Sequence, residues 1–187
     1  PYGNTQPPFS AGELALGAQA RFFARVAGNS PREMTQIFVE AEKFKGTALI
    51  EVLQNCVIFN DGCFTEFTDK AVREDKQLHV EHGKPMIFGK NRDRGLVLKG
   101  LKLEVATLGE DGISEKDILV HDARQQDPTL HQMLVRLHEP LVTGIIRSCP
   151  DETFEEREDA LTAQVKAKSK FVRTDDLFYS GETYEVV

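Results

Sequence analysis

The sequence predicts an α/β fold that continues into a β-rich extension. Between residues 30 and 53, a helix pattern, a glycine and a nearly all-apolar run follow one another. This order is typical of one unit of a doubly wound sheet, in which helices cover both faces of a parallel strand. Between residues 84 and 109, short runs alternate apolar with polar residues, as half-exposed antiparallel strands do.

The amino-acid composition excludes several classes of protein. The 187 residues are 40% hydrophobic, which is enough to fill the core of one domain with an extension. The formal net charge of −7 argues against a surface that binds nucleic acid. No apolar run approaches the roughly 20 residues that span a bilayer, and no signal peptide opens the chain. We therefore expect a cytoplasmic protein without a membrane span or a nucleic-acid partner.

Two further features concern the cell compartment and the start of the chain. The three cysteines are an odd, sparse set, which points to a reducing cytoplasm. The chain begins at Pro1 rather than at a methionine, and its first nine residues are rich in turn formers. We therefore expect the natural product to contain sequence before Pro1.

The first half is expected to form two helices and one strand. Ser10, with Glu13 at capping-box spacing, begins a helix that we expect to continue to about Val26, rich in small residues. A second helix begins at Ser30-Pro31 and ends at Gly46, with one apolar stripe. The run from Thr47 to Leu53 then predicts a strand that is buried on both faces.

The second half is expected to contain mostly short elements. The polar stretch from Thr65 to His79 is expected to form a short helix or an extended loop. Four runs predict strands: Pro85–Phe88, Arg94–Lys99, Leu101–Leu108 and Ile118–Val120.

The last third adds two helices and a strand. Asp127-Pro128 caps a helix, and Leu141–Arg147 is expected to be a strand. A last helix runs from Asp151 to about Ser169, with acidic residues first and basic residues last, as the helix dipole favours. The tail from Asp176 is expected to end in a turn and a short strand.

Cys56 is the best-placed candidate for chemistry. It directly follows the predicted strand, and open α/β sheets bind ligands at the carboxyl ends of their strands. A thiolate there can ligate a metal or cluster, or act as a nucleophile. The spacing alone favours the alternative, a small buried residue. Cys63 offers a second ligand or a redox partner, and Cys149 is expected to be structural.

The histidines and a basic region give weaker signals. His79 and His82 are three residues apart, a spacing that suits zinc, but no third ligand follows at suitable spacing. Surface histidines explain this pair, and also His131 and His138, better than a metal site. The hairpin region holds six basic residues, which can steer an acidic partner such as an electron carrier or simply protect a sheet edge: Lys84, Lys90, Arg92, Arg94, Lys99 and Lys102.

No phosphate loop, dinucleotide-binding fingerprint or nucleophile elbow is present, so these patterns specify no reaction. Segments along the whole chain nevertheless carry a resemblance. They are PYGNTQPPF, LALGAQARFFAR, KGTALIEVLQNCVIFNDGCF, HGKPMIFG, RGLVLKG, DILVHDARQQDPTL, VTGIIR and SGETYEV. With these segments the chain resembles the β subunit of 2-oxoacid:ferredoxin oxidoreductases, and most of all the 2-oxoglutarate-type enzymes. The match is strongest over residues 1–64.

The resemblance implies a fold and an activity. Residues 1–64 are expected to be the C-terminal part of the doubly wound domain that binds thiamine diphosphate on its pyrophosphate side, and residues 65–187 a β-rich α+β extension. The implied enzyme decarboxylates 2-oxoglutarate or a related 2-oxoacid and transfers the acyl group to coenzyme A. The electrons pass through a 4Fe–4S cluster to ferredoxin, and an α subunit, or a fused α and γ, completes the enzyme.

The resemblance also assigns one residue. In the family, three cluster cysteines lie near the N-terminus of the subunit and a fourth in the segment matched by Leu53–Cys56, so Cys56 is expected to be the fourth ligand. Cys63 matches no family ligand. The Gly-Asp-Gly motif for Mg²⁺ and diphosphate and the Thr-Gly-Gly-Gln segment do not occur in this sequence. We therefore assign no thiamine ligand, and expect the chain to be inactive alone. The alternative is a non-catalytic binding or assembly module with this fold.

Overall fold

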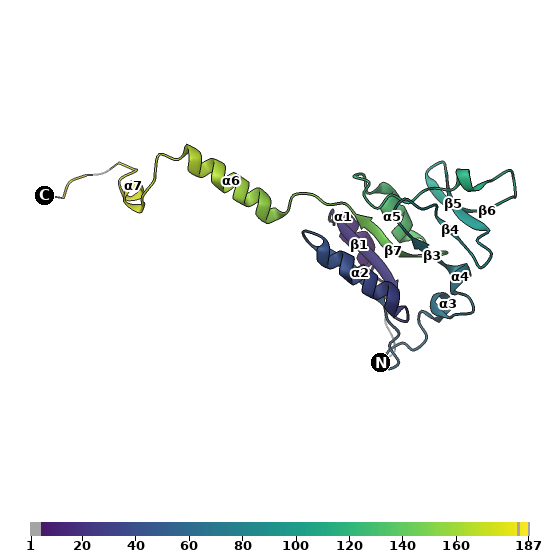
Figure 1. The fold of residues 1–187 in the computed structure, drawn as a ribbon. Coiled ribbons are helices and arrows are strands. Elements are labelled where there is room, and N and C mark those ends of the chain that lie inside the picture. The colour runs from purple at the N-terminus through teal and green to yellow at the C-terminus, as the bar shows by residue number, and fades with distance from the viewer. Residues whose placement is uncertain (1–4, 183, 187) are drawn as a thin grey trace. The chain divides into compact units, whose positions relative to one another are not determined.

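The computed structural model describes residues 5–182 and 184–186 (Figure 1). The chain divides into two compact units, residues 1–151 and residues 152–187. Among the described residues, no helix is both long and apolar enough to cross a membrane.

A four-stranded mixed sheet forms the centre of the first unit, in the order β2-β1-β7-β3. Strands β1 (Phe22–Ala27) and β2 (Ala48–Leu53) run parallel, as do β3 (Gln77–Val80) and β7 (Leu141–Ser148). The two pairs meet where β1 and β7 run antiparallel. The α/β class expected from the sequence is therefore confirmed, and the sheet has both parallel and antiparallel strands.

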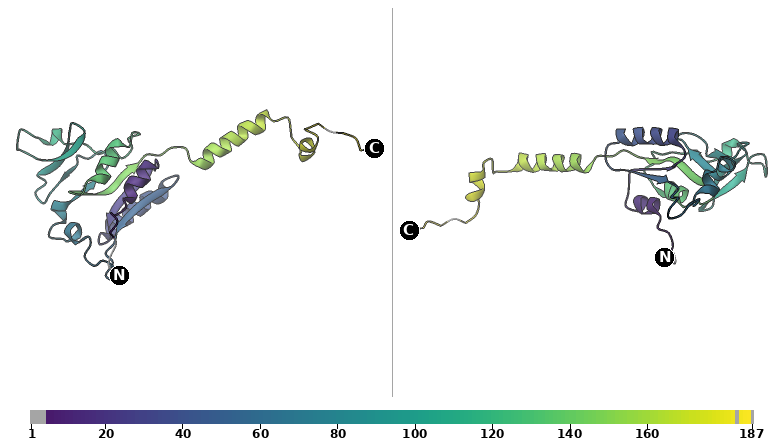
Figure 2. Two further views of the ribbon diagram at one scale, coloured as in Figure 1. Left: turned by 180° about the vertical axis from the view of Figure 1, so that it is seen from behind. Right: turned by 90° about the horizontal axis from the view of Figure 1, so that it is seen from below.

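Helices cover both faces of this sheet (Figure 2). Helix α2 (Pro31–Lys43) lies on one face and packs Ile37 against the β1 side chains Phe22, Ala24 and Val26. The other face is covered by α1 (Ala11–Gly17) and α5 (Thr129–Arg136). Their side chains join the larger core cluster, which comprises Leu16, Phe23, Leu78, Val80, Met86, Phe88, Leu96, Leu134, Val135, Val142 and Ile146.

The predicted hairpin region forms a second, antiparallel sheet of three strands. Its strands are β4 (Ile87–Phe88), β5 (Arg94–Lys99) and β6 (Lys102–Thr107), in that order. Phe88 and Leu96 from this sheet enter the larger core cluster, so the two sheets share one core. The β-rich region predicted between residues 84 and 109 is thus confirmed.

Short helices connect these sheets. Helices α3 (Thr65–Thr68) and α4 (Arg73–Lys76) precede β3, and a 3₁₀ turn, η1 (Glu115–Asp117), follows β6. The strand predicted at residues 118–120 is reduced to a single bridge between Pro85 and Val120. This segment instead buries Ile118, whose side chain fills the space that the absent side chain of Gly95 leaves.

The first predicted helix is wrong beyond Gly17. Helix α1 begins as expected, with the Ser10 side chain accepting a hydrogen bond from the Glu13 N–H at 3.3 Å. It ends at Gly17, and Gln19 takes a left-handed backbone conformation with φ 64°. The residues from Phe22 then form β1, because aromatic and β-branched side chains are completely buried there between the two helical layers.

The strand predicted at residues 47–53 forms, but its burial differs from expectation. Strand β2 is an edge strand, and Leu49 and Val52 are each 37% exposed. Its one charged residue, Glu51, pairs with the buried Arg25 of β1 at 2.6 Å. The Glu51 carboxylate therefore supplies the counter-charge that a buried guanidinium requires.

The second unit consists of two helices and connecting turns. Helix α6 (Phe154–Lys168) matches the predicted last helix, and Thr153 and Glu156 form a capping box at its start. Helix α7 (Thr174–Phe178) occupies the start of the tail. No strand occurs among the described tail residues, whereas a short strand was expected; Thr183 and Val187 lie outside the description.

The predicted boundary after Phe64 remains a prediction about domain organisation. Strands from both sides of that position, β1 and β7, are hydrogen-bonded neighbours in one sheet.

Candidate functional site: the loop after β2

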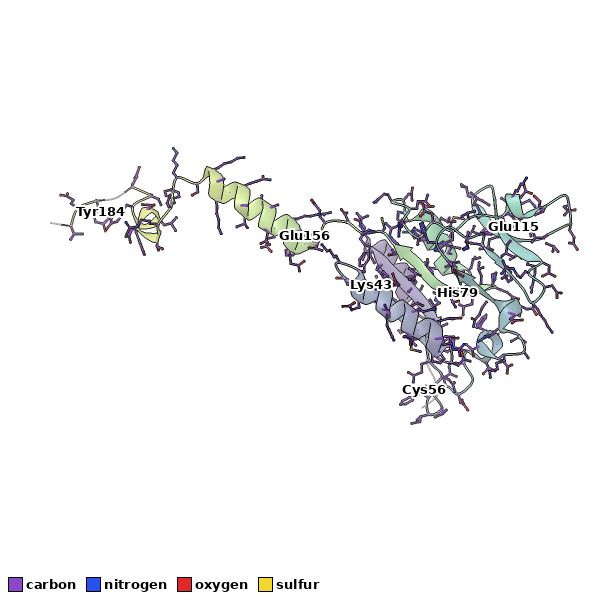
Figure 3. All side chains as sticks on the ribbon, viewed as in Figure 1. Lys43, Cys56, His79, Glu115, Glu156 and Tyr184 are labelled. Atoms are coloured by element: carbon purple, nitrogen blue, oxygen red, sulfur yellow. The ribbon has the colours of Figure 1, made fainter. Side chains whose placement is uncertain are left out.

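The predicted site residue, Cys56, lies on an exposed loop at the carboxyl end of β2. Figure 3 shows this residue outside the sheet, well away from His79. The thiol is free and exposed. The alternative interpretation of Cys56 as a small buried residue is therefore wrong, because the chain leaves the sheet three residues earlier, at Leu53.

Side-chain and backbone hydrogen bonds fold this loop back on itself. The Asn55 side chain accepts a hydrogen bond from the Gly62 N–H at 2.8 Å and donates one to the Asp61 carboxylate at 2.7 Å. The Asn60 N–H donates to the Cys56 carbonyl at 2.9 Å. Gly62 closes the loop with φ 77°, a conformation that favours glycine. The loop therefore holds Cys56 in a defined position although it is exposed.

The same loop favours the ionised form of the Cys56 thiol. Hydrogen bonding by the backbone N–H groups of Phe59, Ile58 and Asn60 lowers the pKa of the Cys56 thiol, and Phe59 has the largest effect. Hydrogen bonds to an anion stabilise the anion, and the thiolate is the form that binds metals and attacks electrophiles. Cys56 is therefore prepared chemically for ligation.

Cys56 offers one exposed thiolate to an iron–sulfur cluster, whereas the other two cysteines are less exposed. A 4Fe–4S cluster is held by four cysteine thiolates. Cys149 is buried elsewhere, with its Sγ 3.7 Å from the Arg21 guanidinium, and Cys63 is half-buried. Among the described residues, no group of three or more histidine, cysteine or acidic side chains is arranged to hold a metal ion.

The loop carries an exposed apolar tip beside the thiol. Val57, Ile58 and Phe59 are 74%, 82% and 89% exposed. It is unusual for three consecutive apolar side chains on a loop to be exposed to solvent, and contiguous exposed apolar residues mark interaction sites. We call these three residues the apolar tip; they were not singled out by the sequence reasoning, although the letters VIF after Cys56 were a usable signal.

The two histidines considered for zinc have different partners. His79 Nδ1 lies 3.5 Å from the Thr143 hydroxyl, whereas His82 Nδ1 lies 3.3 Å from the Asp122 carboxylate. The expectation that His131 is a surface residue is wrong. This ring is fully buried, donates from Nε2 to the Asp122 carbonyl at 2.8 Å and accepts from Arg147 at Nδ1.

The basic residues of the hairpin region are only partly neutralised. Arg94 pairs with Asp75 and lies 4.9 Å from the centre of the Phe88 ring, and Lys99 pairs with Glu104 at 3.5 Å. Lys84 and Arg92 are exposed, and neither has an ion-pair partner in the part of the chain that the structure describes. Both expected roles, edge protection and attraction of an acidic group, remain open for these residues.

Comparison with known proteins adds a decisive observation. No family model matches the sequence. The chain is, however, 34% identical over 192 aligned residues to the 2-oxoglutarate oxidoreductase subunit KorB of Mycobacterium tuberculosis, and the match covers 100% of this chain and 51% of that protein. The resemblance to this class of β subunit is confirmed. The chain spans about half the length of this curated relative.

Two further matches agree with this KorB relationship. The 2-oxoglutarate synthase subunit KorB of Archaeoglobus fulgidus is 36% identical over 56 residues, which are 30% of this chain and 21% of that protein. A solved 2-oxoglutarate:ferredoxin oxidoreductase from Magnetococcus marinus matches the fold with a TM-score of 0.61. That match covers 97% of this chain and 48% of the solved chain at 14% identity, so it concerns the fold alone.

Proposed function

We propose that this chain is the C-terminal part of the β subunit of a 2-oxoglutarate:ferredoxin oxidoreductase. The observation that carries the proposal is the 34% sequence identity to a KorB subunit, which extends along the whole chain. The reaction would be the oxidative decarboxylation of 2-oxoglutarate, or a related 2-oxoacid, with coenzyme A to acyl-CoA and CO₂. Electrons would pass through a 4Fe–4S cluster to ferredoxin.

Within this enzyme, Cys56 is proposed as one thiolate ligand of the 4Fe–4S cluster. Its exposure, its position at the carboxyl end of a parallel strand and its lowered pKa all support this role. The cluster supplies one-electron transfer when bound. If another part of the enzyme covers the apolar tip, water would be excluded from the neighbourhood of the thiolate, which would strengthen the interaction of the thiolate with a cationic group.

Thiamine diphosphate and Mg²⁺ are proposed cofactors of the complete enzyme. Residues 1–64 would finish the domain that binds them, and α2 followed by β2 forms the expected αβ unit. The family motifs for diphosphate and Mg²⁺ do not occur in these 187 residues, so no residue is assigned to either group. The chemistry on the substrate would belong to thiamine, and this chain would help to position it.

The proposed partners follow from the same assignment. They are the α subunit, or a fused α and γ, ferredoxin, the 2-oxoacid and coenzyme A. The exposed apolar tip suits a surface that another part of the enzyme covers. A cytoplasmic location remains a prediction.

The ligand role of Cys56 is tested by Cys56→Ala in the complete enzyme complex. We expect the variant complex to lose cluster iron and the visible absorbance near ~400 nm that thiolate-bound clusters show. Cys63→Ala is the matched control, because Cys63 lies in the same loop region, is less exposed and matches no family ligand, and it should retain both signals. Unchanged iron in the Cys56 variant would remove this residue from the ligand set.

A second candidate, a non-catalytic binding or assembly module, is favoured only by the apolar tip and the unpaired basic residues. The intact mass of the native protein separates the two proposals. A native product far longer than 187 residues that carries the Gly-Asp-Gly and cysteine motifs supports the enzyme, and a product that begins near Pro1 supports the module.

A further inference from the structure

A cavity of about 230 Å³ lies at the base of the hairpin, separate from the Cys56 loop. Residues of β3, of the segment between β3 and β4, of β4 itself and of the turn between β4 and β5 form its lining. We call this cavity the hairpin notch; it is lined by His79, Glu81, Lys84, Pro85, Ile87 and Arg92.

Positive charge predominates in the notch. Lys84 and Arg92 bring two full positive charges, against one negative charge from Glu81. As described above, neither basic side chain has an ion-pair partner among the described residues. Arg94 and Lys99 of the same hairpin are paired, whereas Lys90 and Lys102 also have no ion-pair partner among the described residues. What distinguishes Lys84 and Arg92 is that both line the same cavity.

The backbone of Arg92 is an independent sign that this position is specialised. Arg92 has φ 52°, which lies in the left-handed region that glycine, asparagine and aspartate occupy far more readily. The turn holds a bulky, charged residue there. Backbone strain at a residue that lines a cavity is frequent at binding sites, where the position of the side chain matters more than local stability.

His79 adds a third group with hydrogen-bonding capacity. Its Nδ1 lies near the Thr143 hydroxyl, which leaves Nε2 without a partner in the described part of the chain. The neighbouring Gly144 has φ +99°, and a Cβ there would lie 2.5 Å from the Val80 carbonyl and 3.2 Å from His79 Cε1. Glycine at this position therefore permits the close approach of the Val80 backbone, and it leaves the space beside the imidazole open.

The notch adjoins a larger groove. His79 and Glu81 also line a cavity of about 470 Å³ beside α2, and Glu33, Gln36 and Glu40 of α2 line it as well. The floor of the groove includes Gly144 and Ile145 of β7. A ligand anchored in the notch has space there for an organic body, and the carboxylates of α2 suit hydroxyl or ammonium groups on it.

We propose that the hairpin notch binds the phosphate group of a small organic phosphate whose body lies in the groove beside α2. An arginine guanidinium offers paired donors to phosphate oxygens, and a lysine ammonium adds a point charge. Two cations match the charge of a phosphate monoester. Its second pKa is about 6, so its charge is about −1.5 to −2 near neutral pH. The proposal does not depend on the enzymatic role of Cys56.

Isothermal titration calorimetry on the full chain tests this binding with two probes, inorganic phosphate and glucosamine 6-phosphate. The sugar phosphate should bind more tightly, because only its body reaches the groove. Arg92→Gly removes the charge and relieves the backbone conformation, so folding should survive, and Lys84→Gln removes the second charge. We expect each variant to weaken binding by about tenfold. Glu81→Gln should strengthen binding, because it removes the one negative charge of the notch.

The matched control is Lys102→Gln, which makes the same change in charge on the same sheet outside the notch. Its affinity should stay within about twofold of the unaltered chain. If Lys102→Gln and Lys84→Gln lost the same amount of binding affinity, the loss would depend on the net charge of the protein and not on the notch, and the proposal would be overturned. Absence of binding below about 10 mM of either probe would also overturn it. Equal affinity for both probes would overturn the part of the proposal that concerns the groove.

Discussion

His121 is a buried imidazole whose two nitrogens have different surroundings. Its side chain is fully buried, and Nε2 lies 3.0 Å from the Ile145 carbonyl. A carbonyl oxygen only accepts, so Nε2 carries the proton, and Nδ1 has no partner among the described residues. Burial, followed by smaller effects that include the neighbouring His131, lowers the pKa of His121 to about 4. The ring is therefore neutral in the folded protein near pH 7.

We predict that this ring makes the fold sensitive to acid. The pKa of His121 is about 4 when folded and 6.5 in its ordinary state, so the unfolded chain binds the proton more readily. Its contribution to stability is complete above pH 6.5 and is lost as the pH falls through about 4. The free energy of unfolding should fall by on the order of 3 kcal/mol across this range from His121, and burial lowers the pKa of His131 in the same direction.

Urea unfolding between pH 7.5 and pH 4 measures this effect. His121→Gln keeps a donor for the Ile145 carbonyl and cannot titrate, so its stability should depend less on pH. His138→Gln, at an exposed histidine, is the control and should keep the full dependence. An unchanged pH dependence in His121→Gln would contradict the prediction.

Single residues differ in how far the sequence predicts them. The position of Cys56 after an apolar run indicated the end of a strand, and that placement is correct. Its exposure was not predictable, because free cysteine is among the most often buried residue types and the sequence does not show where the loop after the strand lies. The burial of His131 depends on Arg147 and Asp122, which lie sixteen and nine residues away and meet it only in the folded chain.

At the scale of elements, α1 depends on a close contact with β1 and α5. Gly12 is buried, and a Cβ there would lie 2.7 Å from both Phe23 Cζ and Val135 Cγ1. Two buried side chains from different elements thus converge on the bare backbone of α1. Small residues allow such close packing, and among those of this stretch Gly12 is a position that requires it.

Gly12→Ala should destabilise the protein although alanine is the better helix former. The helix gains at most about 1 kcal/mol from the exchange, whereas forcing a methyl group into a filled core costs about 1–3 kcal/mol. We expect a net loss of about 1–2 kcal/mol in denaturant unfolding. Gly17→Ala in the same helix is the control, because nothing lies within 4 Å of its added Cβ, and it should be neutral or stabilising. A stabilising Gly12→Ala would show that the packing there is looser than described.

The boundary between α1 and β1 shows what local patterns miss. The spacing of Ser10 and Glu13 correctly predicted where the helix begins. The small residues then continued a helical composition past Gly17, although the chain turns at Gln19. Phe22–Ala27 becomes a strand because β2 and β7 offer hydrogen-bonding partners on both sides, and those partners are distant in sequence.

At the scale of the whole molecule, the first unit contains every residue of both core clusters. Helix α6 buries no residue, and its apolar side chains Phe154, Leu161 and Val165 are at least 60% exposed. Local features stabilise this helix instead: a capping box at its start, acidic residues in the first turn and basic residues in the last.

We predict that residues 1–151 fold without the second unit. Thermal unfolding followed by circular dichroism should give a Tm within about 2 °C of the full chain, because no core residue is removed. The helical signal should decrease by the contribution of α6 and α7. A loss of about 5 °C or more would mean that the second unit stabilises the first.

The sequence by itself determined the α/β class, most helix starts, the β-rich hairpin region, the strand that ends shortly before Cys56 and the resemblance to the β subunit of 2-oxoacid:ferredoxin oxidoreductases. These features depend on apolar spacing, caps and turn residues within a few positions of one another. Only the tertiary structure decided that β7 joins β1 antiparallel, that β2 is an edge strand, that His121 and His131 are buried, and that Lys84 and Arg92 are left unpaired beside His79. Each of these depends on groups far apart in the chain, whose meeting is set by how the elements pack.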